Sequence, residues 1–208
     1  GFCIFNNIAI AVKKLVNEGK RVLIFDFDAH LGDGTVNIFY DTDQVFYWSL
    51  HQHPAFPGGG DYDEIGTGKG GGYTLNIPLP AGSSDDIFLG AVERFLPIAK
   101  QFKPDVVGVS AGFDGYVHDL LLNLRFSARA YHRLGRMLAE NFENIFATLE
   151  GGYNVAMLPN CLWNFIDGIN GDEIRFEDPS TESDIKVMQE YHLLESNIER
   201  LMKPYWRI

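Results

Sequence analysis

Cysteine and long apolar runs are both scarce in this chain of 208 residues. Two cysteines, Cys3 and Cys161, are too few for a disulfide framework, so a reducing cytoplasm is the expected compartment. No apolar run approaches the roughly 20 residues that cross a bilayer, and no membrane association is expected. The first 15 residues lack a small-residue cleavage site, which argues against a signal peptide.

Positive charge is also scarce. The chain has 17 Lys and Arg against 28 Asp and Glu, which gives a formal net charge of -11. Direct nucleic-acid binding is therefore not expected, because it needs a basic surface for the phosphates. The acidic surface either only keeps the protein soluble or attracts a cationic partner, such as a polyamine or a lysine-rich tail.

The apolar content of 46% and the order of the elements predict one α/β domain over residues 1–208. Strand-like and helix-like segments alternate, which is typical of a parallel β-sheet flanked by helices. The expected strands are 21–26, 44–50, 73–77, 105–110 and 145–149. The expected helices are 7–18, 35–40, 84–103, 127–141, 157–169 and an amphipathic C-terminal helix over 184–203.

Polar or glycine-rich sequence lies at the ends of four of these strands or directly after them. Since parallel strands end at one edge of a sheet, these segments are expected to meet there and to form a site. They are Asp28-Ala29-His30, Ser49-Leu50-His51, Ser110-Ala111-Gly112-Phe113-Asp114 and Glu150-Gly151-Gly152-Tyr153.

The segment after the strand 21–26 predicts a metal site. Asp28 and His30 stand at alternate positions, so their side chains share a face in extended chain. With Asp114 they make three ligands and leave room for solvent, which is the donor set of a catalytic zinc site. Without Asp114, the Asp-x-Asp-x-His pattern could equally be a helix cap or a hydrogen-bonded strand end. Asp26 lies one step deeper and either supports the ligands, binds a monovalent cation, or only caps backbone amides.

Several strings together resemble the zinc-dependent histone deacetylase family, within the arginase/deacetylase fold. The resemblance extends from Gly1 to about Asn170, and the Glu-Gly-Gly-Tyr-Asn string looks most like the bacterial, archaeal and class II branch, which includes acetylpolyamine amidohydrolases. The matching strings are Gly1-Phe2-Cys3-Ile4-Phe5-Asn6-Asn7, Asp26-Phe27-Asp28-Ala29-His30-Leu31-Gly32-Asp33-Gly34-Thr35, Ser49-Leu50-His51, Phe56-Pro57-Gly58, Tyr73-Thr74-Leu75-Asn76-Ile77-Pro78, Ser110-Ala111-Gly112-Phe113-Asp114 and Glu150-Gly151-Gly152-Tyr153-Asn154.

The resemblance implies a role for each matching residue. Asp28, His30 and Asp114 align with the zinc ligands, and Tyr153 aligns with the tyrosine that stabilises the oxyanion. The substrate channel would be formed by Phe2, Phe56, Leu121, Gly151 and Gly152. One structural K⁺ or Na⁺ site would involve Asp26, Asp28, His30, Ser49 and Leu50, and a second would involve the backbone of Phe39, Thr42, Val45 and Tyr73.

The chain departs from the family pattern in one important respect. In the family, a His-His pair that acts as general acid and base precedes the Gly-Phe-Cys string, and this chain begins at Gly1. Asp26 and Asp33 match the carboxylates that orient that pair. We therefore expect a fragment that lacks the N-terminal part of the fold and has impaired activity by itself. At the rim, Leu120 replaces the proline that is common in the family.

Three functions remain open at this stage. The first is a zinc-dependent hydrolase that removes acetyl groups from lysine side chains or polyamines. The second is a non-catalytic module that binds zinc and acyl-lysine. The third is a ureohydrolase of the arginase type, which needs a second metal and an aspartate where this chain has Gly32. A homo-oligomer could cover a sheet edge left exposed in a fragment.

Overall fold

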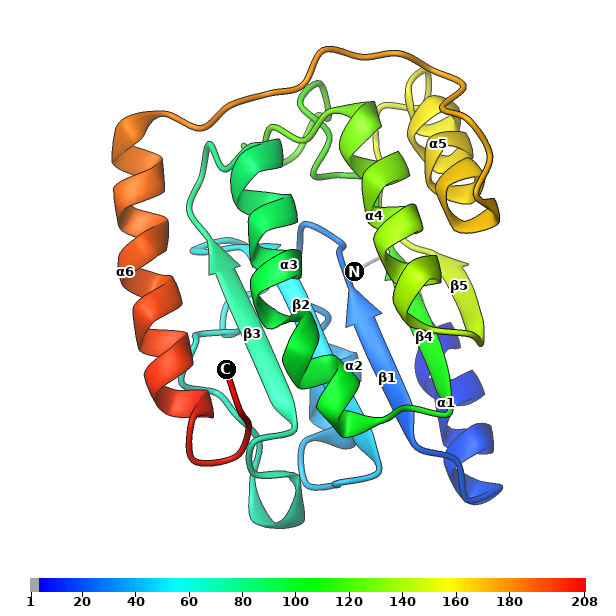
Figure 1. The fold of residues 1–208 in the computed structure, drawn as a ribbon, viewed down its shortest axis with the longest axis vertical. Helices are drawn as coiled ribbons and strands as arrows, with labels where there is room; N and C mark the ends of the chain where they lie inside the picture. The colour runs from blue at the N-terminus through cyan, green and yellow to red at the C-terminus, as the bar shows by residue number, and fades with distance from the viewer. Residues whose placement is uncertain (1–3) are drawn as a thin grey trace.

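The structure is a computed structural model that describes residues 4–208 (Figure 1). These residues form a five-stranded parallel sheet in the order β3-β2-β1-β4-β5. The strands are β1 (Val22–Asp26), β2 (Val45–Gln52), β3 (Thr74–Leu79), β4 (Val106–Ala111) and β5 (Ile145–Leu149). The helices are α1 (Asn7–Asn17), α2 (Asp33–Phe39), the short 3-10 helix η1 (Gly68–Gly70), α3 (Asp85–Phe102), α4 (Ala128–Asn141), α5 (Leu158–Asn170) and α6 (Ile185–Met202).

Alternate side chains of β1 face the two layers that cover the sheet. Leu23 and Phe25 belong to the large apolar core beneath α3 and α4, which lie in front of the sheet in Figure 1. Val22 and Ile24 point to the opposite face and pack with buried residues of α1 and α2. Since both faces of the strand are covered, all five of its residues are buried.

The strand order changes direction between β1 and β4. From β1 the chain adds β2 and then β3 on one side, and it later crosses to place β4 and β5 on the other side. Open parallel sheets bind ligands in the crevice outside the carboxyl ends of the two strands at such a reversal. The segments that follow Asp26 and Ala111 therefore meet at the position where a site is expected.

The two edges of the sheet are covered differently. α6 lies beside β3, and the indole Nε1 of Trp206 donates a hydrogen bond of 2.7 Å to the carbonyl of Gly72. β5 is only partly buried, and the side chain of Leu149 is 52% exposed.

The expected α/β architecture is confirmed, and each expected helix and strand is present. The largest differences are of two residues: β2 and β3 each continue two residues beyond the predicted end, and α2 begins two residues before the predicted start. The added part of β3 contains Pro78. A proline is tolerated there because β3 is an edge strand, where a missing N–H interrupts no ladder on the open side.

Candidate metal centre

Two aspartates fold the chain back on itself directly after β1. Oδ1 of Asp26 accepts a hydrogen bond of 3.1 Å from the backbone N–H of Asp28. Oδ1 of Asp28 then accepts one of 2.8 Å from the backbone N–H of His30. Aspartate side chains commonly bond to the backbone two residues ahead in this way. The two turns place the side chains of Asp28 and His30 next to each other.

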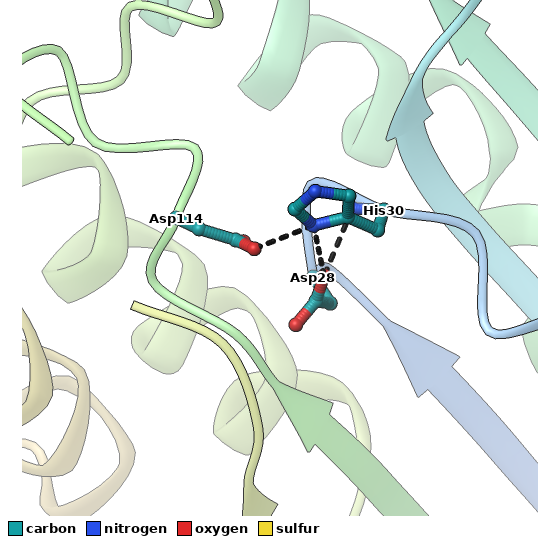
Figure 2. A group of neighbouring side chains, drawn as sticks. All are labelled: Asp28, His30 and Asp114. Carbon is teal, nitrogen blue, oxygen red and sulfur yellow. Dashed lines mark hydrogen bonds and ion pairs between the residues drawn. The ribbon is translucent and has the colours of Figure 1, made fainter. Parts of the chain in front are cut away.

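Asp114, which follows β4, completes a group of three side chains at the strand reversal (Figure 2). Its Oδ2 lies 2.7 Å from Nδ1 of His30, and Oδ1 of Asp28 lies 3.3 Å from the same nitrogen. One potential ligand atom from each of the three residues lies within 4.8 Å of the other two. The sequence-predicted ligands are therefore close enough to bind one ion.

Backbone amides hold both carboxylates in position. Oδ1 of Asp114 accepts a hydrogen bond of 2.8 Å from the N–H of Ala29. Oδ2 of Asp28 accepts another of 2.8 Å from the N–H of Gly151. Gly151 has to be a glycine, because a Cβ at this position would lie 2.7 Å from Oδ2 of Asp28 and closer still to Oδ2 of Asp114. The close approach of the chain to the three side chains explains the glycine after β5.

The two carboxylates change the proton affinity of the imidazole between them. Hydrogen bonds to Asp114 and then to Asp28 raise the pKa of His30 to about 9. Burial raises the pKa of Asp114 to about 6. Burial also acts to raise the pKa of Asp28, but hydrogen bonds from His30 and from the amides of His30 and Gly151 outweigh it and lower the pKa. The raised pKa therefore favours a protonated imidazole between the two carboxylates.

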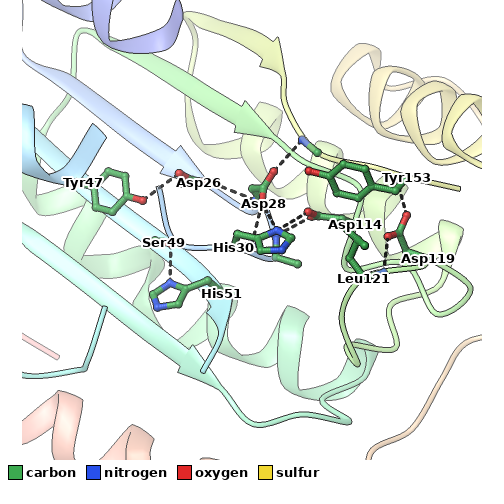
Figure 3. Close-up of polar contacts among 12 residues, drawn as sticks. Asp26, Asp28, His30, Tyr47, Ser49, His51, Asp114, Asp119, Leu121 and Tyr153 are labelled. Carbon is green, nitrogen blue, oxygen red and sulfur yellow. Dashed lines mark hydrogen bonds and ion pairs between the residues drawn. The ribbon is translucent and has the colours of Figure 1, made fainter. Parts of the chain in front are cut away.

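Asp26 lies between Asp28 and Tyr47 of β2 (Figure 3). The residue is 2% exposed and pairs in register with Ser49 of β2. Its Oδ2 accepts a hydrogen bond of 2.9 Å from the hydroxyl of Tyr47. Burial, and then the charge of Asp28, raise the pKa of Asp26 well above its usual value. Asp26 therefore caps the backbone amide of Asp28. Its part in orienting a histidine or binding a monovalent cation stays a prediction.

The residues predicted for the monovalent cation sites occupy two parts of the sheet. Ser49 and Leu50 are buried in β2, where the hydroxyl of Ser49 lies 2.8 Å from Nδ1 of His51. The second set gathers at the opposite end of β2. It consists of Phe39 at the end of α2, Thr42 in the following turn, Val45 at the start of β2, and Tyr73 before β3. The carbonyl of Tyr73 accepts a hydrogen bond from the backbone N–H of Tyr47.

Tyr153 lies next to His30 of the three-residue group. Its ring stands perpendicular to that of His30, with a centroid separation of 6.4 Å. Its backbone N–H donates a hydrogen bond of 2.7 Å to Oδ2 of Asp119. The contribution of Asp119 was missed in the sequence, because no local pattern links it to a residue 34 positions later.

The predicted rim residues are exposed. The side chains of Phe56 and Leu121 are 72% and 51% exposed, and Leu121 comes from the loop that carries Asp119. Phe2 lies outside the described residues. Asp33 is exposed at the start of α2, and Gly152 has a φ of 133°, a conformation that favours glycine.

His51 is held inside the fold, away from Asp28, His30 and Asp114 in its hydrogen bonding. It is 1% exposed. Its Nε2 lies 3.0 Å from the carbonyl of Gly60, which belongs to the glycine-rich loop between β2 and β3 (residues 57–72). Burial lowers the pKa of His51 to about 4, so the ring is neutral. Among residues 4–208, the hydrogen-bond partners of Asp28, His30 and Asp114 include no second histidine.

Comparison with known proteins identifies the family. Residues 1–169 match the model of the histone deacetylase domain. A probable deacetylase of Archaeoglobus fulgidus is 37% identical to the whole chain, which covers 62% of that relative. A histone deacetylase-like amidohydrolase of Pseudomonas aeruginosa is 34% identical over 86% of the chain and 50% of the relative. The chain belongs to the histone deacetylase family, and it spans about half of the length of the curated relatives that it matches.

Solved structures agree with this assignment. The crystal structure of the HDA15 HD domain superposes with a TM-score of 0.87 and 32% identity, over 99% of this chain and 57% of that one. The histone deacetylase Clr3 gives a TM-score of 0.88 and 30% identity, over 98% of this chain and 36% of that one. The arginase/deacetylase fold expected from the sequence is therefore confirmed.

Within residues 4–208, none of the helices combines the length and the apolar character that a bilayer crossing requires.

Proposed function

We propose that this chain forms the zinc-binding half of an amide hydrolase that removes acetyl groups from lysine side chains or polyamines. The observation that carries the proposal is the group Asp28, His30 and Asp114, with Tyr153 beside it, at the strand reversal of the sheet. The activity suggested by the names of its relatives supports this function.

The donor set fits zinc. One imidazole nitrogen and two carboxylate oxygens are the ligands of a three-residue catalytic site, in which a further position stays open for water or substrate. A bound zinc ion polarises an amide carbonyl and lowers the pKa of its water toward about 7. The protein contributes rigid ligands, because amides of Ala29, His30 and Gly151 hold the carboxylates before any ion binds.

Tyr153 is suited to stabilise negative charge on the substrate. Its ring approaches His30 edge-on, at the rim of the three-residue group. A phenolic hydroxyl at this position donates a hydrogen bond to the oxygen of the tetrahedral intermediate, which carries more charge than the carbonyl from which it forms. Phe56, Leu121 and, by resemblance, Phe2 would hold the extended alkyl chain of the substrate.

The acidic surface and the buried carboxylates favour cations as partners. A net charge of -11 attracts lysine-rich tails and polyamines before they reach the site. K⁺ or Na⁺ at the two predicted monovalent sites would offset the buried charge of Asp26, whose pKa is raised mainly by burial.

A non-catalytic acyl-lysine-binding module is the second candidate. It is favoured by one observation: within residues 4–208, the hydrogen-bond partners of Asp26, one of the two carboxylates that would orient a His-His pair, include no histidine. General acid and base groups contribute about 10² to 10⁴ in rate, so we expect weak hydrolysis by the 208-residue chain alone.

A ureohydrolase is disfavoured by the packing around Gly32. A Cβ at this position would lie 2.6 Å from Oδ2 of Asp26 and 2.9 Å from the hydroxyl of Tyr47. The aspartate that a second metal would need therefore has no space there.

The test is a titration of zinc and an acetyl-lysine peptide with the wild-type chain and with Tyr153→Phe. We expect one zinc per chain in both proteins, weaker peptide binding in the variant, and any hydrolysis reduced by about 10². Peptide binding without hydrolysis would select the binding module. Absence of zinc binding by the wild-type chain would reject both candidates.

A further inference from the structure

One carboxylate joins the loop after β4 to the segment that carries Tyr153 (Figure 3). Oδ2 of Asp119 accepts two hydrogen bonds from consecutive backbone amides, 2.7 Å from the N–H of Tyr153 and 2.9 Å from that of Asn154. A second hydrogen bond joins the same segments: the side-chain amide of Asn154 donates it to the carbonyl of His118, at 2.8 Å. Two adjacent N–H groups directed at one carboxylate oxygen form strong, charge-assisted bonds.

The segment before Tyr153 has its own anchor, two residues earlier. The N–H of Gly151 donates a hydrogen bond to Oδ2 of Asp28. The carbonyl of Gly151 accepts a hydrogen bond of 2.9 Å from the N–H of Phe113. Gly152 stands between the two anchors with a φ of 133°, a region in which glycine moves more freely than other residues. Without the second anchor, rotation about Gly152 would carry the Tyr153 ring away from His30.

The same carboxylate also contacts the rim. Its Oδ1 accepts a longer hydrogen bond of 3.4 Å from the N–H of Leu121, whose side chain is 51% exposed. Asp119 therefore connects a polar group of the site with an apolar residue of its mouth.

We propose that Asp119 is a positioning residue that fixes the Tyr153 hydroxyl relative to the metal ligands and to Leu121. This inference rests on the proposed deacetylase function for its chemical meaning. The clamp, by which we mean the two hydrogen bonds from the amides of Tyr153 and Asn154 to Asp119, does not depend on that function.

The test compares Asp119→Ala, Asp119→Asn, Tyr153→Phe and the double variant of Asp119→Ala with Tyr153→Phe, all in the zinc-loaded chain. The probe is an alkyl hydroxamate, which chelates zinc and offers a carbonyl oxygen to the tyrosine. We expect one zinc per chain in every protein. Asp119→Ala and Tyr153→Phe should each weaken hydroxamate binding about threefold to tenfold. The double variant should bind no more weakly than the weaker single variant, because both changes remove the same contact.

Asp119→Asn should give an intermediate affinity. Asparagine keeps a carbonyl oxygen for the two amides but presents an NH₂ group to the N–H of Leu121. Asp172→Ala, which alters an exposed aspartate after α5, is the matched control and should bind as the wild type does. Effects of the two single changes that multiply in the double variant would overturn the proposal, because a purely structural role of Asp119 gives that result.

Amide hydrogen exchange tests the clamp independently of zinc chemistry. The amides of Tyr153 and Asn154 should exchange faster in Asp119→Ala, while amides of the core strand β1 should be unchanged. Unchanged exchange at both amides would overturn the proposal. Failure of the wild-type chain to bind zinc or the hydroxamate would instead reject the proposed function, and the exchange result would still decide whether Asp119 forms the clamp.

Discussion

Nδ1 of His30 lies 2.7 Å from Oδ2 of Asp114, although 84 positions separate the two residues in the chain. The contact forms because β1 and β4 are neighbours in the sheet, with Asp26 in register with Ser110. Each strand therefore delivers its following loop to the same crevice. The geometry of the proposed zinc site is a consequence of the strand order, and four predictions follow from the contacts within it.

Replacing Asp114 by alanine should abolish stoichiometric zinc binding. The change removes one of three ligands and leaves His30 with Asp28 alone. We expect zinc content after dialysis to fall from one per chain to near zero. Asp63→Ala, at an exposed position in the glycine-rich loop, is the control. Equal zinc content in the two variants would show that Asp114 is not a ligand.

Zinc affinity should rise with pH. In the metal-free chain, hydrogen bonds to Asp114 and Asp28 raise the pKa of His30 to about 9, so the ring is protonated at neutral pH. Zinc has to displace that proton, and its apparent affinity should increase about tenfold per pH unit below this pKa. Competition with a chelator at about pH 6, 7 and 8 measures the slope. A flat profile over this range would contradict the assignment of His30 as a ligand.

The raised pKa of His30 also predicts that the chain without zinc becomes less stable as the pH rises. A raised histidine pKa stabilises the folded state fully below the unfolded-state value of about 6.5. This contribution is lost as the pH rises through the folded-state value of about 9. Urea unfolding of the metal-free chain should therefore show a lower midpoint at alkaline pH, and His30→Gln should remove most of that dependence.

Adding one methyl group at Gly151 should damage the site while the fold persists. The new Cβ would lie 2.7 Å from Oδ2 of Asp28 and would also contact the carboxylate of Asp114. We expect Gly151→Ala to lose most zinc affinity and about 1–3 kcal/mol of stability. Gly90→Ala in α3 is the matched control, because its Cβ would meet nothing within 4 Å. It should bind zinc normally and gain about 0.5–1 kcal/mol of stability.

Phe27 should contribute more to stability than any exposed aromatic residue. It is 0% exposed and packs edge-on against Phe113 at a centroid distance of 5.5 Å. Phe27→Ala should reduce the free energy of unfolding by about 3–5 kcal/mol. Phe5→Ala, at a position that is 70% exposed, should change it by less than about 0.5 kcal/mol. Denaturant unfolding measures both, and similar losses would contradict the described core.

The sequence could indicate that Asp28, His30 and Asp114 lie together because the signal is local in each case. Asp28 and His30 are two residues apart after an apolar strand, and Asp114 follows a second such strand. Parallel pairing then brings the two loops together. The strands and helices were predicted to within two residues at every end, with the largest errors at the ends of β2 and β3 and at the start of α2.

The supporting contacts could not be predicted in the same way. The bond from Tyr47 to Asp26 and the two bonds from the Tyr153 segment to Asp119 join residues with no common sequence pattern. Each depends on how loops and neighbouring strands pack in three dimensions. The glycine at position 151 was visible in the sequence, but its steric reason, the closeness of Asp28 and Asp114, required coordinates.

The most direct test of the account is a crystal structure of the zinc-loaded chain, with anomalous diffraction collected at the zinc absorption edge. The account predicts a single peak about 2.0–2.2 Å from Nδ1 of His30 and from carboxylate oxygens of Asp28 and Asp114. A peak bound by other residues, or a pair of neighbouring peaks, would contradict it.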